Sequence, residues 1–170
     1  MTSTRNEKIM KTMGLKLVLI VLIPLITLFT SACSEKQVIF PPVMDAKTRG
    51  YCGSCHMAFQ PSMLPAGSWR LIMDGLDDHF DEKIVLQPNL IRSISQYHIN
   101  NAGDSDAAGK AGQTGLAGLL PNKYPLRITD TPYFKQEHSF LENRILDDWV
   151  GSTANCPVCH VGAWVGDYRI

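Results

Sequence analysis

Apolar residues recur at intervals of three and four in several stretches of the chain, which is the spacing of one helix face. The clearest stretch begins at Trp69, with Ser68 as a suitable N-cap residue, and we predict a helix from there to about Asp78. His79 continues the same face, so we expect it on the buried side. The positions that define this face are Trp69, Ile72, Met73, Leu76, His79 and Phe80.

Three further segments carry signals for the start of a helix. Pro88 suits the first turn of a second helix, whose apolar face would include His98. Thr131 and Pro132 supply the N-cap and the first residue of a third helix, and Asn155 can cap a short one near the C-terminus. No stretch alternates apolar and polar residues as a half-buried strand does. The expected fold class is therefore mainly α, with extensive loops.

Residues 1–32 have the composition of a secretory signal. Basic residues precede an almost wholly apolar run over 17–30, and small residues follow it. The run is shorter than the roughly 20 residues that span a bilayer, so we predict cleavage rather than a retained anchor. Cleavage before Cys33 would make this cysteine the lipidated first residue of a periplasmic lipoprotein. Cleavage that leaves a free thiol at Cys33 is the alternative.

Two copies of a five-residue motif supply the candidate chemistry, at residues 52–56 (CGSCH) and 156–160 (CPVCH). Two thiols at this spacing bind both vinyl groups of one porphyrin, and the histidine that follows binds its iron. A zinc site is a less favoured alternative, because its Cys pairs rarely carry this histidine and the chain is exported. We predict two covalent haem c groups. The thioether cysteines would be Cys52, Cys55, Cys156 and Cys159, and the proximal iron ligands His56 and His160.

Composition divides the rest of the chain around these motifs. Residues 102–122 are rich in Gly and Ala and are expected to form a linker. We therefore expect a tether over 33–50, a first haem half over 51–101 and a second over 123–170. Such small halves bury little surface, so the haems are expected to form much of the core. Equal numbers of basic and acidic residues give a net charge of zero, and nothing indicates nucleic-acid binding.

The second axial ligand of each iron decides between electron transfer and chemistry at the metal. The ten residues after His160 contain neither Met nor His, and no Met follows Met73. His138 is therefore the strongest candidate for a distal ligand, and which of the two haems it serves stays open. His79 is the next candidate, because it ends an aromatic-rich face close to the first motif. Alternatives that remain open are His98, Met63 and Met73.

Three blocks of the chain resemble the bacterial dihaem cytochrome c family and occur in the family's order. They cover about half of the exported chain and comprise residues 51–83, 127–138 and 154–168. Within them His79 and His138 match the family's distal-ligand segments, so the resemblance implies that both bind iron. The family usually has Gly where this chain has Asp81. We expect this difference to alter the turn after His79 but to leave the ligand in place. Cys33 falls outside the likeness.

The expected function is that of an exported electron carrier with two six-coordinate haems and no substrate chemistry of its own. The resemblance implies that electrons arrive from a membrane b-type cytochrome or quinol route and leave to a soluble haem protein. The alternatives are a dihaem enzyme, either a peroxidase or a small-molecule reductase, and a gas-binding sensor. Each alternative needs one haem iron with a free axial position. The supply of spare histidines argues against such a free position.

Overall fold

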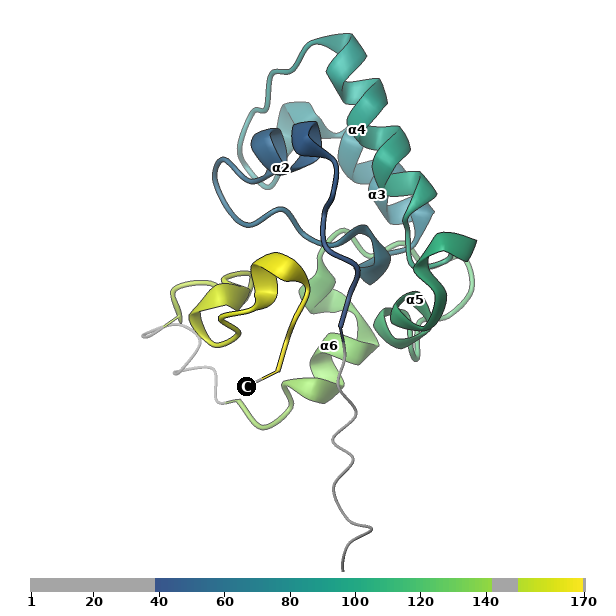
Figure 1. Ribbon diagram of the computed structural model, residues 1–170, viewed down its shortest axis with the longest axis vertical. Helices are drawn as coiled ribbons and strands as arrows, with labels where there is room; N and C mark the ends of the chain where they lie inside the picture. The colour runs from purple at the N-terminus through teal and green to yellow at the C-terminus, as the bar shows by residue number, and fades with distance from the viewer. Residues whose placement is uncertain (1–38, 142–149, 170) are drawn as a thin grey trace, which may run out of the picture. The chain divides into compact units, whose positions relative to one another are not determined.

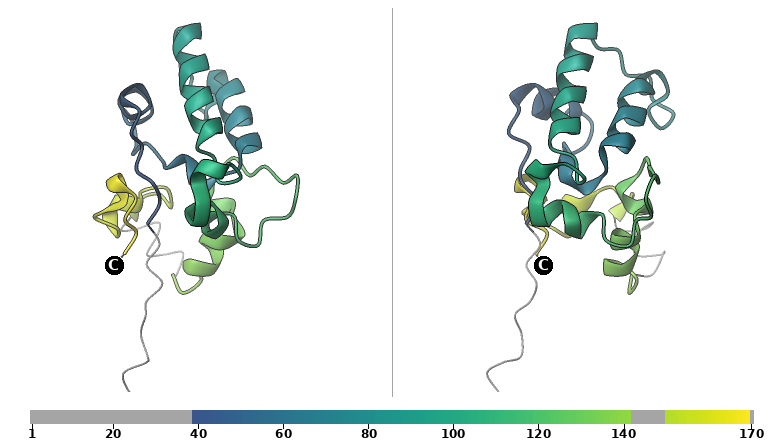
Figure 2. Two further views of the ribbon diagram at one scale, coloured as in Figure 1. Left: turned by 45° about the vertical axis from the view of Figure 1, so that its right-hand side comes forward. Right: turned by 90° about the vertical axis from the view of Figure 1, so that its right-hand side faces the viewer.

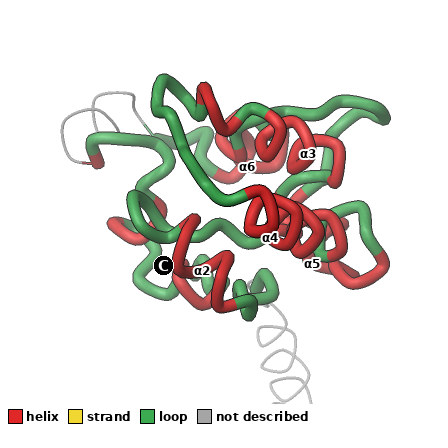
Figure 3. The backbone as a smooth tube through the Cα atoms, turned by 90° about the horizontal axis from the view of Figure 1, so that it is seen from above, coloured by secondary structure: helices red, strands yellow, loops and turns green. Residues whose placement is uncertain are grey.

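The computed structural model describes residues 39–141 and 150–169, so the predicted signal segment and Cys33 lie outside the described residues. Within these ranges the chain consists of helices and loops (Figure 3), and strand pairing is limited to two isolated bridges. The predicted mainly α fold class is confirmed. The α-helices are α2 (Ala46–Cys52), α3 (Ala66–Asp74), α4 (Pro88–Asn100), α5 (Gly109–Gly115) and α6 (Pro132–Glu137). The 3-10 helices are η2 (Pro61–Met63), η3 (Leu76–Asp78), η4 (Asp106–Ala108), η5 (Ile128–Asp130), η7 (Cys156–Val158) and η8 (Ala163–Val165).

Helices α3 and α4 lie side by side and form the centre of the core (Figures 1 and 2). On α4, Ile94 is fully buried and the ring of His98 packs against Trp69 of α3, with 4.3 Å between ring centroids. Leu64 and Ala102 complete the buried cluster around Trp69. The start of α4 agrees with the prediction from Pro88, because proline needs no hydrogen-bonded N–H in a first turn.

The predicted limits of α3 are wrong at both ends. The helix begins at Ala66, after Pro65 in an extended conformation, so Ser68 lies inside it and is fully buried. It ends at Asp74, because Gly75 has low helix propensity and its N–H bonds to the carbonyl of Leu71 in the cap. His79 therefore does not continue a helix face, and lies in the turn that follows η3.

The turn after His79 is tight and left-handed. The backbone N–H of His79 donates to the carbonyl of Glu82 at 2.7 Å, and the reverse bond measures 3.2 Å. Phe80 and Asp81 between them have φ angles of 54° and 74°, in the region that favours glycine. Asp81 thus occupies a position that suits Gly, and Asp tolerates this conformation better than most residues.

The segment expected as a linker, 102–122, is packed against the first half. Ala102 and Ala108 are buried, and α5 lies against η2. A Cβ at Gly112 would overlap the carbonyl oxygen of Gly103, so this glycine is needed for close approach of two backbones. The small residues that suggested a flexible linker therefore allow tight packing.

The segment expected as a tether, 33–50, is packed from Phe40 onward. The Phe40 side chain is buried, and its ring lies 6.4 Å from that of Tyr133 and 5.6 Å from that of Tyr168. Its N–H donates to the carbonyl of Gly166 at 2.8 Å. The segment around Phe40 therefore packs against the segment around Gly166 and Tyr168 near the end of the chain.

Candidate haem sites

The first motif begins in α2 and continues into the turn beyond it. Asp45 caps this helix, since its carboxylate accepts the N–H of Thr48 at 2.7 Å. Cys52 is the last helical residue, and Cys55 and His56 follow in exposed turns. A helix end therefore presents the two thiols and the imidazole within one short segment. The second motif instead starts a helix, because Cys156 is the first residue of η7 and Asn155 takes the predicted N-cap position.

No disulfide joins Cys52, Cys55, Cys156 or Cys159, so all four sulfurs are available for thioether bonds. Burial raises the pKa of the Cys52 thiol to about 11, and the charge of Asp45 adds to the rise. Burial also raises the pKa of Cys156. Among the described residues no three His, Cys, Asp or Glu side chains come together as a metal site, and the zinc alternative has no set of ligands there.

The structure brings His79 next to His56. Their ring centroids are 6.3 Å apart, and the ring planes differ by 22°. An imidazole nitrogen binds a metal at about 2.0 Å, so two imidazoles on opposite sides of one ion have centroids about 6 Å apart. The spacing of this pair therefore fits one iron between the rings. Burial lowers the pKa of His79, and the charges of His56 and Arg127 lower it further, which favours the neutral form that binds metals.

The structure likewise brings His138 next to His160. Their ring centroids are 5.9 Å apart, and the planes differ by 83°. His138 follows directly after α6, whose predicted N-cap, Thr131, is confirmed by the hydrogen bond that its side chain accepts from Phe134. Burial lowers the pKa of His160, and His138 lowers it further, while the carbonyl groups of Tyr168 and Arg169 act in the opposite direction.

Backbone carbonyls orient one ring of each pair. Nδ1 of His56 lies 2.7 Å from the carbonyl oxygen of Met57, and Nδ1 of His138 lies 2.9 Å from that of Phe134. With Nδ1–H donating to the carbonyl, the lone pair of Nε2 is free to bind a metal. In His160, Nδ1 is buried and has no hydrogen-bond partner among the described residues.

The other candidate ligands lie in the packed core. Nδ1 of His98 is 2.9 Å from the carbonyl oxygen of Ile94, and the rings that contact His98 are those of Trp69 and Tyr97. Met63 and Met73 are buried as well. His98 is thus a core histidine with a backbone partner, whereas His79 and His138 each lie beside a histidine that directly follows a CxxC pair.

A hollow of 290 Å³ lies beside His79. Apolar side chains line part of it, and the charged residues Asp78, Asp81 and Arg127 line the rest. The Arg127 guanidinium lies 4.0 Å from the centroid of the Phe80 ring. Large apolar side chains remain exposed around both motifs, as expected where porphyrin faces would cover them. Near the first hollow they are Leu71, Phe80 and Leu126, and near the second motif Val158, Val161, Trp164 and Val165.

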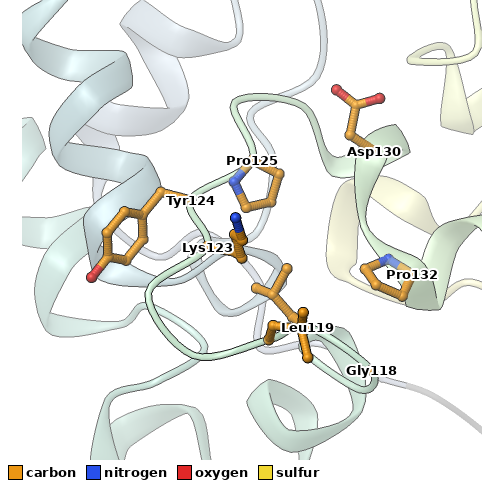
Figure 4. Close-up of a pocket in the computed structure, with 8 residues that line it drawn as sticks. Gly118, Leu119, Lys123, Tyr124, Pro125, Asp130 and Pro132 are labelled. Carbon is orange, nitrogen blue, oxygen red and sulfur yellow. The ribbon is translucent and has the colours of Figure 1, made fainter.

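A second hollow, of 440 Å³, lies between the loop after α5 and the start of α6 (Figure 4). Lys123, Tyr124 and Pro125 line it from the loop, and Asp130 and Pro132 line it from the helix side. None of the predicted haem ligands lines this hollow. Its size therefore does not make it a haem site.

Each of the two CxxCH segments thus has a second histidine beside its own, an arrangement that suits two covalent haems. The family model described as dihaem cytochrome c matches residues 48–168. The chain belongs to this family. It is 39% identical to a diheme cytochrome c from Rhodobacter sphaeroides, which matches 75% of this chain and 98% of its own, with a TM-score of 0.67. It is 30% identical to a diheme cytochrome c from Shewanella baltica OS155, which matches 73% of this chain and 86% of its own, with a TM-score of 0.59. No protein among the curated ones matches.

Membership confirms the resemblance seen in the sequence. The protein is a haem protein with two covalent haem c groups, and its two CxxC pairs fit the attachment motifs. Over 39–141 and 150–169, no helix is long and apolar enough to cross a membrane.

Sequence reasoning missed the residues that orient the histidines. Phe134 supplies both a carbonyl and a stacked ring to His138, and Phe59 stacks on His56. Tyr168 packs edge-on against His160, with 5.5 Å between centroids. The spacing of four residues between Phe134 and His138 was a visible signal. The contact of Tyr168 was not, because it depends on where the last segment folds back.

Proposed function

We propose that this dihaem cytochrome c is a periplasmic electron carrier in which both irons are six-coordinate, with His56 and His79 on one and His160 and His138 on the other. The observation that carries the proposal is the pairing of each motif histidine with one distant histidine at about 6 Å between ring centroids. A closed iron favours transfer of electrons over chemistry at the metal.

The roles of the side chains follow from their surroundings. The four motif cysteines hold the porphyrins covalently, and each bound haem supplies an iron that alternates between the ferric and ferrous forms. His56 and His138 are oriented by backbone carbonyls, which keep Nε2 directed to metal binding. His160 is buried, which limits the access of water on that side of the second site. No acid or base is needed, since no bond of a substrate is broken.

Variants of the histidines test the ligand assignment. His138→Ala should convert one iron from low spin to high spin, and the reduced protein should then bind carbon monoxide. His79→Ala should do the same at the other iron. His98→Ala is the matched control, because its ring lies in the core, and both irons should stay low-spin.

Electron paramagnetic resonance of the oxidised holoprotein measures the spin states. If His138→Ala leaves both irons low-spin while His98→Ala opens one, the assignment is wrong. Carbon monoxide binding by the unmodified protein would instead favour the enzyme or the gas sensor, because each requires an open iron.

The proposed route runs from a membrane b-type cytochrome or quinol to this protein and then to a soluble haem protein. Family membership supports an electron-transfer role, and the proposed ligation of both irons by two histidines is consistent with a relay. The test is stopped-flow absorbance with quinol-reduced membranes and with the soluble haem protein. Both haems should be reduced by the membranes, and reduced protein should pass electrons to the partner. Reduction only by small-molecule reductants would contradict the route.

Lipid attachment at Cys33 is the proposed means of holding the carrier at the membrane. Its support is the position of Cys33 after a signal-like segment that ends in small residues. A lipoprotein-processing host should incorporate labelled palmitate, and Cys33→Ala should release the protein into the soluble periplasmic fraction. Absence of label together with unchanged fractionation would refute the anchor.

A further inference from the structure

The two histidine pairs differ in the orientation of their rings. The planes of His56 and His79 are within 22° of parallel, whereas those of His138 and His160 are 83° apart. The centroid distances are similar, at 6.3 and 5.9 Å. Each pair would therefore present two imidazole rings to iron at a similar spacing but with different relative orientations of the ring planes.

Contacts with Phe134 of α6 hold the ring of His138 in its orientation. The ring stacks on that of Phe134, with centroids 4.0 Å apart and planes within 16°. The carbonyl of Phe134 also accepts the Nδ1–H of His138 at 2.9 Å. These two contacts fix both the position and the rotation of the imidazole, because the two residues are one helical turn apart.

Contacts from the C-terminal segment hold the ring of His160. The ring of Tyr168 meets it at 61°, with 5.5 Å between centroids. The Tyr168 hydroxyl donates to Oε1 of Gln60 at 2.5 Å, and Gln60 is fully buried. The crossed orientation therefore results from two independent supports, one on each side of the pair.

At the first pair the supports give nearly parallel rings. His56 stacks on Phe59, with 5.0 Å between centroids and an angle of 30°, and its Nδ1 lies 2.7 Å from the carbonyl oxygen of Met57. His79 meets Phe80 at 4.8 Å in the left-handed turn. The orientation at this site is thus set by residues local to each histidine.

Imidazole orientation acts on the iron through its d orbitals. Parallel rings donate into the same d orbital of low-spin ferric iron, which separates it in energy from its partner. Crossed rings donate into two different orbitals, which then stay nearly equal in energy. When the two d orbitals are nearly equal in energy, the electron paramagnetic resonance signal is strongly anisotropic. When they are well separated in energy, the signal is an ordinary rhombic one.

We propose that the two haem sites are electronically inequivalent because Phe134 holds His138 across the plane of His160, while His56 and His79 stay nearly parallel. Phe134 is a positioning residue that acts through His138. The inference rests on the proposed ligation by two histidines at each iron, and it adds the orientation that distinguishes the sites.

Low-temperature electron paramagnetic resonance of the oxidised holoprotein tests it. The spectrum should contain two low-spin signals of equal intensity, one rhombic with three resolved g values and one with a single very large g value. His138→Ala should abolish the large-g signal, and His79→Ala the rhombic one. Two rhombic low-spin signals would overturn the inference while leaving the ligation intact. A high-spin iron in the unmodified protein would overturn the ligation itself.

Variants at Phe134 test the positioning role. Phe134→Leu keeps the backbone carbonyl but removes the stacked ring, so the large-g signal should broaden or shift toward a rhombic one while the iron stays low-spin. Phe134→Tyr should retain the signal. Lys135→Ala, on the same helix, is the control and should not change it. An unchanged large-g signal in Phe134→Leu would refute the role of this ring.

Discussion

Replacing Gln60 with methionine should destabilise the protein, because this side chain links the first haem segment to the last segment of the chain. Gln60 is fully buried. Its Nε2 donates to the carbonyl of Ala163 at 2.8 Å, and its Oε1 accepts from the hydroxyl of Tyr168 at 2.5 Å. Methionine has a similar volume but can form neither hydrogen bond. The change therefore removes polar contacts without opening a large cavity.

The expected loss follows from the groups left behind. The buried carbonyl of Ala163 and the part-buried hydroxyl of Tyr168 would each lose a strong partner, at about 1–3 kcal/mol per group and nearer the lower value for the hydroxyl. The hydroxyl of Tyr168 retains only a weak hydrogen bond to Sδ of Met63 at 3.8 Å. Gln60→Met should therefore lower the free energy of unfolding by about 3 kcal/mol. For a unit of this size, the melting temperature should fall by roughly 10 °C.

Chemical denaturation followed by far-ultraviolet circular dichroism measures the change. Ser62→Ala is the matched control, since Ser62 is also buried and lies two residues away. Its hydroxyl has no hydrogen-bond partner among the described residues, so its removal should change stability by less than about 0.5 kcal/mol. Equal effects of the two substitutions, or no effect of Gln60→Met, would refute the proposed link.

Three further predictions concern the turn, the cap and the buried histidine. Asp81→Gly should stabilise the protein by about 0.5 kcal/mol in urea unfolding, because φ is 74° there, and Asp81→Ala should destabilise it. Thr131→Ala should cost about 1 kcal/mol in the same assay, through loss of the cap of α6, while Thr131→Ser should retain most of it. Burial lowers the pKa of His98, so the unfolded chain binds a proton that the folded protein does not. The free energy of unfolding should therefore fall as pH drops below about 6.5. His98→Leu should flatten this dependence between pH 7 and 5, and an unchanged slope would contradict the assignment.

The residues that attach the haems were identifiable from the sequence because thioether chemistry requires a fixed local spacing. Two thiols and a histidine within five residues define each site whatever the rest of the chain does. The start of a helix was also predicted correctly where one local hydrogen bond defines it. Thr131, for example, caps α6 through its own side chain. The end of α3 was predicted wrongly, since the apolar spacing continued past Gly75 although the helix did not.

The tertiary structure decided which distant histidine lies beside which motif. His79 is near His56 in sequence, but His98 also lay on an apolar helix face, and only packing against Trp69 places it in the core. His138 meets His160 because the last segment folds back, which no local pattern records. Composition misled at 102–122, because glycine suits both a flexible loop and a close contact between backbones. Local chemistry therefore determined where the haems attach. The contacts between distant segments decided the histidine pairs and the orientation of their rings, because these depend on surfaces that only the folded chain brings together.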